Sequence, residues 1–115
     1  MGSRSTATRV PKGSRVFVFG SALWSARPND VDVLIVFDTS YCPPAEAYGR
    51  HAGLCRALEL AWHLPVHLTL LTRSEEASLG FIGHSRAIEI TWADILECHT
   101  FLEIVGCSRD LGPAF

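Results

Sequence analysis

Apolar and polar residues follow the pattern of a β-strand in three segments of the chain. Residues 15–19 (RVFVF) are β-branched and aromatic and stop at Gly20, which predicts a short buried strand. Residues 30–38 (DVDVLIVFD) have apolar side chains on both faces over their second half, which is typical of a central strand covered on both sides. Residues 66–72 (VHLTLLT) alternate cleanly and predict a third strand.

A long helix is predicted between the second and third strands. Residues 44–63 follow a Pro-Pro pair and repeat apolar side chains at helical spacing, so one face of this helix should pack on the sheet. Pro65 ends it. A single helical turn fits residues 21–26, between the first two strands.

The last third of the chain contains two helix-start signals. Residues 72–75 (TRSE) fit a capping box and predict a short helix that ends near Gly80. Thr91 begins a second signal, with an acid in the first turn, and predicts a helix to about Val105. Residues 81–90 fit a strand and a helix equally well.

Length and composition indicate one folded domain. The chain has 115 residues, and its 48% of hydrophobic residues excludes disorder of the whole. Residues 1–14 are polar and without period, so we expect a flexible leader there, a domain over 15–106 and a tail over 107–115. The patterns together predict a single small domain of the α/β (α+β) class, with helices packed on a β-sheet.

Charge, hydropathy and cysteine content limit the kinds of partner and the cell compartment to be expected. The net charge of -2 does not fit a basic nucleic-acid binder, although five cations among residues 1–29 form either a solvated tail or an attraction for phosphate. The longest apolar run is about five residues, far short of a membrane span of about 20. The four cysteines contain no CxxC pair and no signal peptide is present, so we expect a cytoplasmic protein with reduced thiols.

The residues with the strongest chemical signal lie around the start of the second strand. Gly20 lets a backbone approach a bulky anion, and Ser21 offers a hydroxyl and an N–H to phosphate oxygens. Asp30 and Asp32 are two apart on a strand, so their side chains point to the same face. Two such carboxylates repel each other unless a cation lies between them, and Mg²⁺ prefers a few carboxylates plus substrate phosphates.

This ordered set, FGSALWSARPNDVDVLIVFD, resembles the signature of the nucleotidyltransferase superfamily typified by DNA polymerase β, and more closely its small single-domain members, the minimal nucleotidyltransferases. The family pattern is Gly-Ser after a strand, a gap, then Asp-x-Asp at the head of the next strand. Gly20, Ser21, Asp30 and Asp32 match it, and the resemblance covers residues 15 to about 72. It implies a mixed sheet and the transfer of a nucleoside monophosphate from a nucleoside triphosphate to a hydroxyl or phosphate acceptor.

The resemblance also implies roles for these residues, and the sequence departs from the family pattern in lacking the third acid, the glycine that often follows the Gly-Ser turn and a helix before the first strand. Gly20 and Ser21 would hold the triphosphate. The two aspartates would bind two metal ions, which we expect to be Mg²⁺. The family has a third carboxylate on a following strand, but residues 66–72 contain none. His67 matches that position best and Thr69 second. An imidazole suits Mn²⁺ better than Mg²⁺ and would also serve as a general base.

Two functions follow from this departure. The first is an active metal-dependent nucleotidyltransferase with an unknown acceptor, for which nucleic acid is one option. The second is a catalytically degenerate nucleotide-binding module acting beside a helical, HEPN-type partner, as an antitoxin-like protein would. The resemblance implies such a partner, whereas a small domain with an exposed sheet edge or face also predicts a homo-oligomer.

Each candidate residue also has a purely structural interpretation. The two aspartates would cap a strand end, and His67 would be a half-buried histidine. His51 and Cys55 lie one turn apart on the predicted helix and would begin a zinc site, but no second pair is placed to complete it. Trp24 would either stack on a nucleobase or pack in the core or at its rim.

Overall fold

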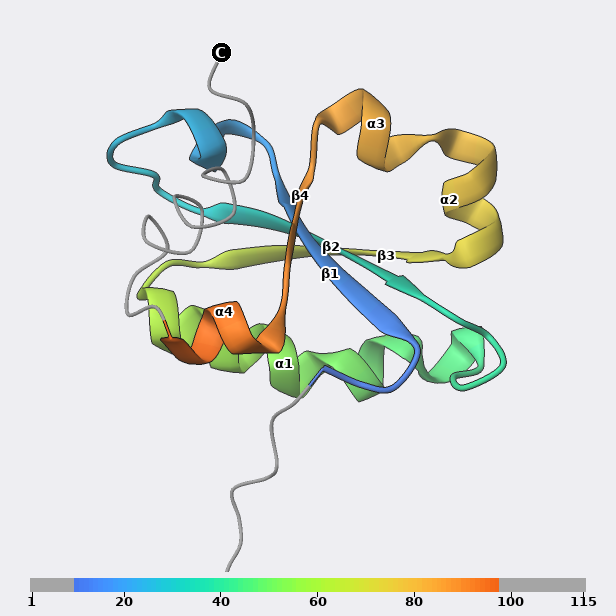
Figure 1. Cartoon of the computed structure of the whole chain (residues 1–115). Coiled ribbons are helices and arrows are strands. Elements are labelled where there is room, and N and C mark those ends of the chain that lie inside the picture. Colours follow the sequence, from blue (N-terminus) through green and yellow to red (C-terminus); the bar gives the residue numbers. More distant parts are fainter. Residues whose placement is uncertain (1–9, 98–115) are drawn as a thin grey trace, which may run out of the picture.

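The computed structural model describes residues 10–97, which form a four-stranded sheet with helices on both faces (Figure 1). The strands are β1 (Ser14–Phe19), β2 (Val31–Phe37), β3 (Val66–Thr72) and β4 (Ile88–Ile90), in the order β3-β2-β1-β4. β1 pairs antiparallel with β2 and β4, whereas β2 pairs parallel with β3, so the sheet is mixed. The predicted strands are confirmed as neighbours, and β2 is an interior strand.

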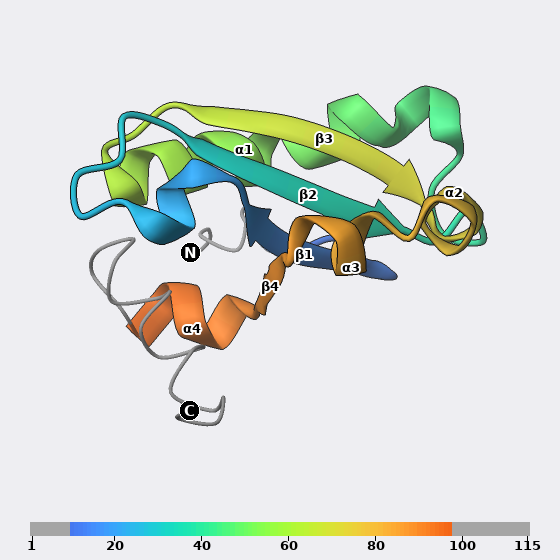
Figure 2. The ribbon, with the colours of Figure 1, turned by 90° about the horizontal axis from the view of Figure 1, so that it is seen from above.

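The helical elements are η2 (Ser21–Trp24), η3 (Pro44–Glu46), α1 (Ala47–Trp62), α2 (Arg73–Leu79), α3 (Phe81–Ser85) and α4 (Trp92–Glu97). α1 and α4 lie on one side of the sheet, and α2 and α3 lie towards the other (Figures 1 and 2). None of the helices within residues 10–97 is long and apolar enough to cross a membrane. This part of the chain is therefore a small α+β domain, as expected.

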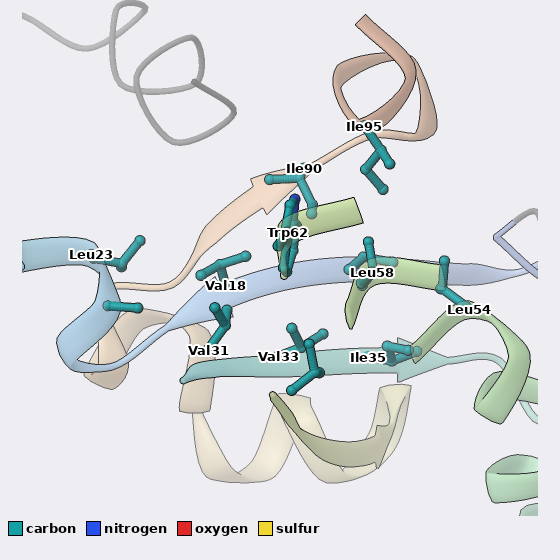
Figure 3. Close-up of a cluster of buried hydrophobic side chains, with 13 residues drawn as sticks. Val18, Leu23, Val31, Val33, Ile35, Leu54, Leu58, Trp62, Ile90 and Ile95 are labelled. Carbon is teal, nitrogen blue, oxygen red and sulfur yellow. The ribbon is translucent and has the colours of Figure 1, made fainter. Parts of the chain in front are cut away.

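The core has a layer on each face of β2. Val31, Val33 and Ile35 pack against the inward stripe of α1, together with Val18 and the other buried residues drawn in Figure 3. Leu34 belongs to the opposite layer, beneath α3. Burial of one such aliphatic side chain contributes about 1.5–3 kcal/mol, so this doubly covered strand is the strongest element of the fold.

The structure confirms the predicted ends of two helices. The predicted helix 44–63 is confirmed as η3 and α1, and it ends at His63 in a left-handed conformation (φ 58°) two residues before Pro65. In the capping box of α2, the Glu75 N–H donates to Thr72 Oγ1 at 3.1 Å and the Thr72 N–H donates to Glu75 Oε1 at 2.9 Å. α2 ends at Gly80, as predicted.

The ambiguous segment 81–90 contains both kinds of structure, α3 and then β4. The two are separated at Arg86, whose left-handed backbone (φ 56°) ends the helical turn. β4 forms because β1 offers it a free edge, a long-range partner that local periodicity does not reveal.

The ends of the chain are described only in part. Val10 packs against the core, and β1 begins at Ser14, at the end of the expected leader. The predicted continuation of α4 to Val105 and the tail 107–115 lie outside the described residues, as do residues 1–9.

Candidate functional site

The candidate site lies where the amino ends of β2 and β3 meet the end of β1. In the sheet register, Asp32 lies between Phe19 of β1 and His67 of β3. Asp30 directly precedes β2, and the two aspartates share the face opposite α1 because side chains alternate along a strand. The predicted pair of carboxylates on one face is thereby present, with His67 on the same face.

Distances define the group closely. His67 Nδ1 lies 3.5 Å from Asp32 Oδ1 and 3.9 Å from Asp30 Oδ2. These are ion-pair distances only when the ring is protonated, and both exceed the length of a good hydrogen bond. Within residues 10–97, neither aspartate carboxylate accepts any hydrogen bond, although both side chains are more than half covered (40% and 32% exposed). Their oxygens are available to a ligand.

Gly20 is required where it stands. Its backbone has φ 87° and ψ -167°, a region that almost only glycine occupies, and a Cβ placed there would collide with Asp32 Oδ2. The backbone at Gly20 therefore approaches the Asp32 carboxylate more closely than any residue with a Cβ would allow.

The one-turn helix η2 follows this glycine. Ser21 is exposed at its start, and the Leu23 N–H donates to the Gly20 carbonyl at 3.2 Å. Ala22 and Leu23 are buried and fix the turn to the core, whereas the Trp24 side chain is 65% exposed. The core alternative for Trp24 is therefore wrong, and an exposed position at the rim remains.

The side chains of the candidate site would hold a cation only together with oxygen atoms of a bound substrate. No group of three or more His, Cys, Asp and Glu side chains in the described part of the chain is placed to hold a metal ion. Two carboxylates on one face do suit Mg²⁺, which is commonly bound through one or two carboxylates plus substrate phosphates. Asp30 and Asp32 are the residues that would hold it, with Mn²⁺ favoured if the His67 imidazole takes part.

The other predicted residues are placed as follows. Thr69 shares the face of His67 but pairs with Leu34, one step farther from the carboxylates, so His67 is the side chain of β3 that lies beside them. His51 is fully buried: its Nδ1 donates to the Ala47 carbonyl at 2.7 Å and its Nε2 lies 2.8 Å from Ser14 Oγ. Both nitrogens are engaged, so His51 is structural and the zinc alternative fails.

The two cysteines within residues 10–97 are buried or half-buried and are not paired with each other. Cys42 and Cys55 are free thiols, and burial, with a smaller contribution from Glu59, raises the pKa of Cys55. A raised thiol pKa makes a cysteine a poorer nucleophile and metal ligand at neutral pH. Cys98 and Cys107 lie outside the described residues.

A separate cavity of about 540 Å³ lies at the opposite end of the strands. Among its lining residues are Arg15, Asp38 and Arg73. Asp38 accepts hydrogen bonds from the Ser40 N–H at 2.8 Å and from Arg73 Nη1 at 3.0 Å. The Asp-Thr-Ser turn at residues 38–40 is the one local signal of this network in the sequence.

No family model matches this chain, and its comparisons with curated proteins and with solved structures yield no match. What defines the protein is therefore its own geometry, a small α+β domain with a mixed four-stranded sheet and a carboxylate pair at the amino end of its interior strand β2.

Proposed function

We propose that this protein is a metal-dependent nucleotidyltransferase with a polymerase β-like core. It would transfer a nucleoside monophosphate from a nucleoside triphosphate to an acceptor. One observation supports the proposal most strongly. Gly20, Asp32 and His67 come from three neighbouring segments of the chain and lie together, with Asp30 beside them. Within residues 10–97 no group donates a hydrogen bond to this pair of carboxylates, so the pair does not stabilise the fold there. The same pair suits a divalent cation that also binds the phosphates of a substrate.

Each residue has a role in this proposal. The backbone at Gly20 and the exposed Ser21 hydroxyl would bind the triphosphate oxygens, and Asp30 with Asp32 would hold the divalent ion. When bound, that ion neutralises phosphate charge and polarises the transferring phosphoryl group. Asp32 belongs to β2 and Asp30 directly precedes it, so the strand fixes where both carboxylates lie.

His67 would remove the proton from the acceptor hydroxyl. Its side chain is 64% exposed, so an acceptor can reach the ring from solvent. A general base of this kind contributes roughly 10²–10⁴-fold to a rate.

A second candidate function has one observation in its favour. The third position holds an imidazole in place of a carboxylate oxygen, so the metal set is weaker for Mg²⁺. The protein would then be a catalytically degenerate module that binds nucleotide and acts with a helical partner of the HEPN type.

A thermal-shift titration tests nucleotide binding, and a pyrophosphate-release assay separates the two functions. ATP, GTP, CTP and UTP are each added with Mg²⁺ and with Mn²⁺. Stabilisation that requires both nucleotide and metal supports a nucleotide site, since a ligand of the folded state raises stability by mass action. Pyrophosphate release, with water or a hydroxyl of the protein itself as the acceptor, then indicates the transferase, whereas the module predicts binding without release. No shift with any of the four nucleotides would refute both.

A further inference from the structure

The two margins of the sheet differ in how they are protected. β4 is three residues long, and its Glu89 carboxylate receives a bidentate pair of bonds from Arg15 at 2.7 and 2.9 Å. β3 has seven residues, VHLTLLT, with no acid, lysine, arginine or proline. Natural proteins usually blunt an edge strand by shortness, charge or proline, and β3 at the outer margin of the sheet has none of these (Figure 2).

Hydrogen bonds show which backbone groups of β3 point outwards. The Pro65 carbonyl accepts from the Val31 N–H at 2.9 Å, so odd-numbered residues direct their polar groups towards β2. Even-numbered residues therefore point away from the sheet. The first outward N–H, of Val66, donates to Glu59 Oε2 at 2.9 Å, and the last, of Thr72, donates to Glu75 Oε1 at 2.9 Å.

These two carboxylates cap the ends of the edge and leave its middle open. Within residues 10–97, the outward backbone groups of Leu68 and Leu70 have no hydrogen-bond partner. Both leucine side chains lie on the α1 side, packed against the core but only half buried. The open segment is therefore short, apolar and uncharged.

We propose that this edge pairs with the same edge of a second copy of the chain, antiparallel and around a two-fold axis at Thr69. In that register Leu68 of each copy lies opposite Leu70 of the other and exchanges both backbone hydrogen bonds with it. Thr69 then lies opposite Thr69 in a pair without hydrogen bonds. Moving the axis to Leu68 or Leu70 would require the N–H of Val66 or Thr72, which the carboxylates already occupy.

Charge also favours a second copy as the occupant. The paired strands carry no charged side chains, so no like charges meet across the ladder. The two carboxylates that cap the ends of the edge lie outside the pairs formed by residues 68 and 70, so the edge is complementary to itself, and the inference does not rest on the proposed function.

Cysteine cross-linking tests the register directly. Opposite residues in a pair without hydrogen bonds have Cα atoms about 4.5 Å apart, within the disulfide range of about 4.4–6.8 Å. Thr69→Cys should therefore give a covalent dimer under mild oxidation. Leu71→Cys is the matched control, because its two copies would be four strand residues, about 13 Å, apart. Equal cross-linking of the two variants, or of the parent chain, would overturn the register.

Sedimentation of the full chain without nucleotide tests the dimer itself. The parent should dimerise in a concentration-dependent way, and Thr69→Lys should weaken the dimer at least tenfold because it places two ammonium groups opposite each other. Thr69→Val, which keeps the β-branched shape, should dimerise like the parent. Near-ultraviolet circular dichroism establishes that each variant is folded. A strict monomer at high micromolar concentration would overturn the proposal, whatever else covers the edge.

Discussion

The two ends of β2 each carry acidic side chains, but these have very different surroundings. At the carboxyl end, Asp38 accepts hydrogen bonds from Ser40 and Arg73, and these donors lower its pKa. At the amino end, the Asp32 and Asp30 carboxylates lie 3.5 and 3.9 Å from His67 Nδ1 and accept no hydrogen bond within residues 10–97. In this part of the chain, the fold uses the oxygens of the carboxylate at one end of β2 and not those of the pair at the other.

This difference separates structural acids from candidate ligands without any reference to a family. A carboxylate with donors contributes to folding, so its removal should cost stability and leave binding unchanged. A pair without donors contributes repulsion in the free protein, so its removal should cost binding and leave stability unchanged or higher. The predictions below test that division along β2.

The largest effect is expected for Asp30→Asn combined with Asp32→Asn. The double variant should lose all metal-dependent stabilisation by nucleoside triphosphate, which for the parent reaches about 2.7 kcal/mol at a ligand concentration of 100 times Kd. Without ligand its melting temperature should equal or exceed that of the parent. Asp38→Asn is the matched control on the same strand and should keep the full ligand-dependent shift. A double variant that still binds Mg²⁺ and nucleotide like the parent would remove Asp30 and Asp32 from the site.

His67 provides the second test, because it stands between the two proposed functions. In an active transferase, His67→Ala should lower the rate of pyrophosphate release by roughly 10²–10⁴-fold if the ring is the general base. In a degenerate module the parent has no rate to lose, and His67→Asp should tighten Mg²⁺–nucleotide binding by supplying an oxygen ligand. Thr69→Asp is the control, since residue 69 pairs with Leu34 and lies away from the aspartates. Both variants are compared at a concentration at which the protein is monomeric, because residue 69 lies on the proposed dimer axis. Equal behaviour of the two aspartate variants would contradict a special position for residue 67.

Gly20→Ala should destabilise the free protein by about 1–3 kcal/mol, because its backbone conformation is nearly exclusive to glycine. The added Cβ also displaces the Asp32 carboxylate, so metal-dependent nucleotide binding should weaken beyond the loss of stability. Gly53→Ala is the control: this exposed position in α1 has nothing within 4 Å of a new Cβ, and it should gain about 0.5–1 kcal/mol. Urea denaturation and the thermal-shift titration measure the two effects separately.

The sequence predicted the elements whose signals are local. β2 has an unmistakable apolar run, α1 has a regular stripe, and the capping box at Thr72 specifies where α2 begins. β4 was left open between strand and helix because its three residues become a strand only by pairing with β1, about 70 residues earlier. Pairing of that kind depends on the tertiary fold and leaves little trace in a short segment.

The sequence predicts which face of the sheet the candidate site residues share, but not how far apart their side chains lie. Parity along the strands places Asp30, Asp32 and His67 on one side, whereas their contact requires the parallel register that sets Asp32 beside His67. The sequence alternative that fails concerns His51, because its spacing from Cys55 on the helix suggested a pair of zinc ligands. Its burial against Ser14, 37 residues away, could not be read from helical spacing.

The smallest expected effect concerns acid stability, and it tests the carboxyl end of β2. The N–H and hydroxyl of Ser40, with Arg73, hold the pKa of Asp38 below its ordinary value of 3.8. A group whose pKa is lower in the folded state stabilises the fold above its unfolded pKa, and that contribution disappears as the pH falls through the folded value. Asp38→Asn should therefore be slightly less stable than the parent at pH 7, and the two should converge progressively below pH 3.8.

Urea unfolding midpoints measured between pH 7 and pH 2.5 check this convergence. Glu89→Gln is a second, parallel case, because hydrogen bonding to Arg15 lowers the pKa of Glu89 from 4.5, so its difference from the parent should fade below pH 4.5. The Asp30→Asn, Asp32→Asn double variant should show no deficit at pH 7, since it removes a repulsion and no hydrogen bond made within residues 10–97. If that double variant were destabilised at neutral pH as Asp38→Asn is, the amino-end carboxylates would be structural acids and the contrast between the two ends of β2 would fail.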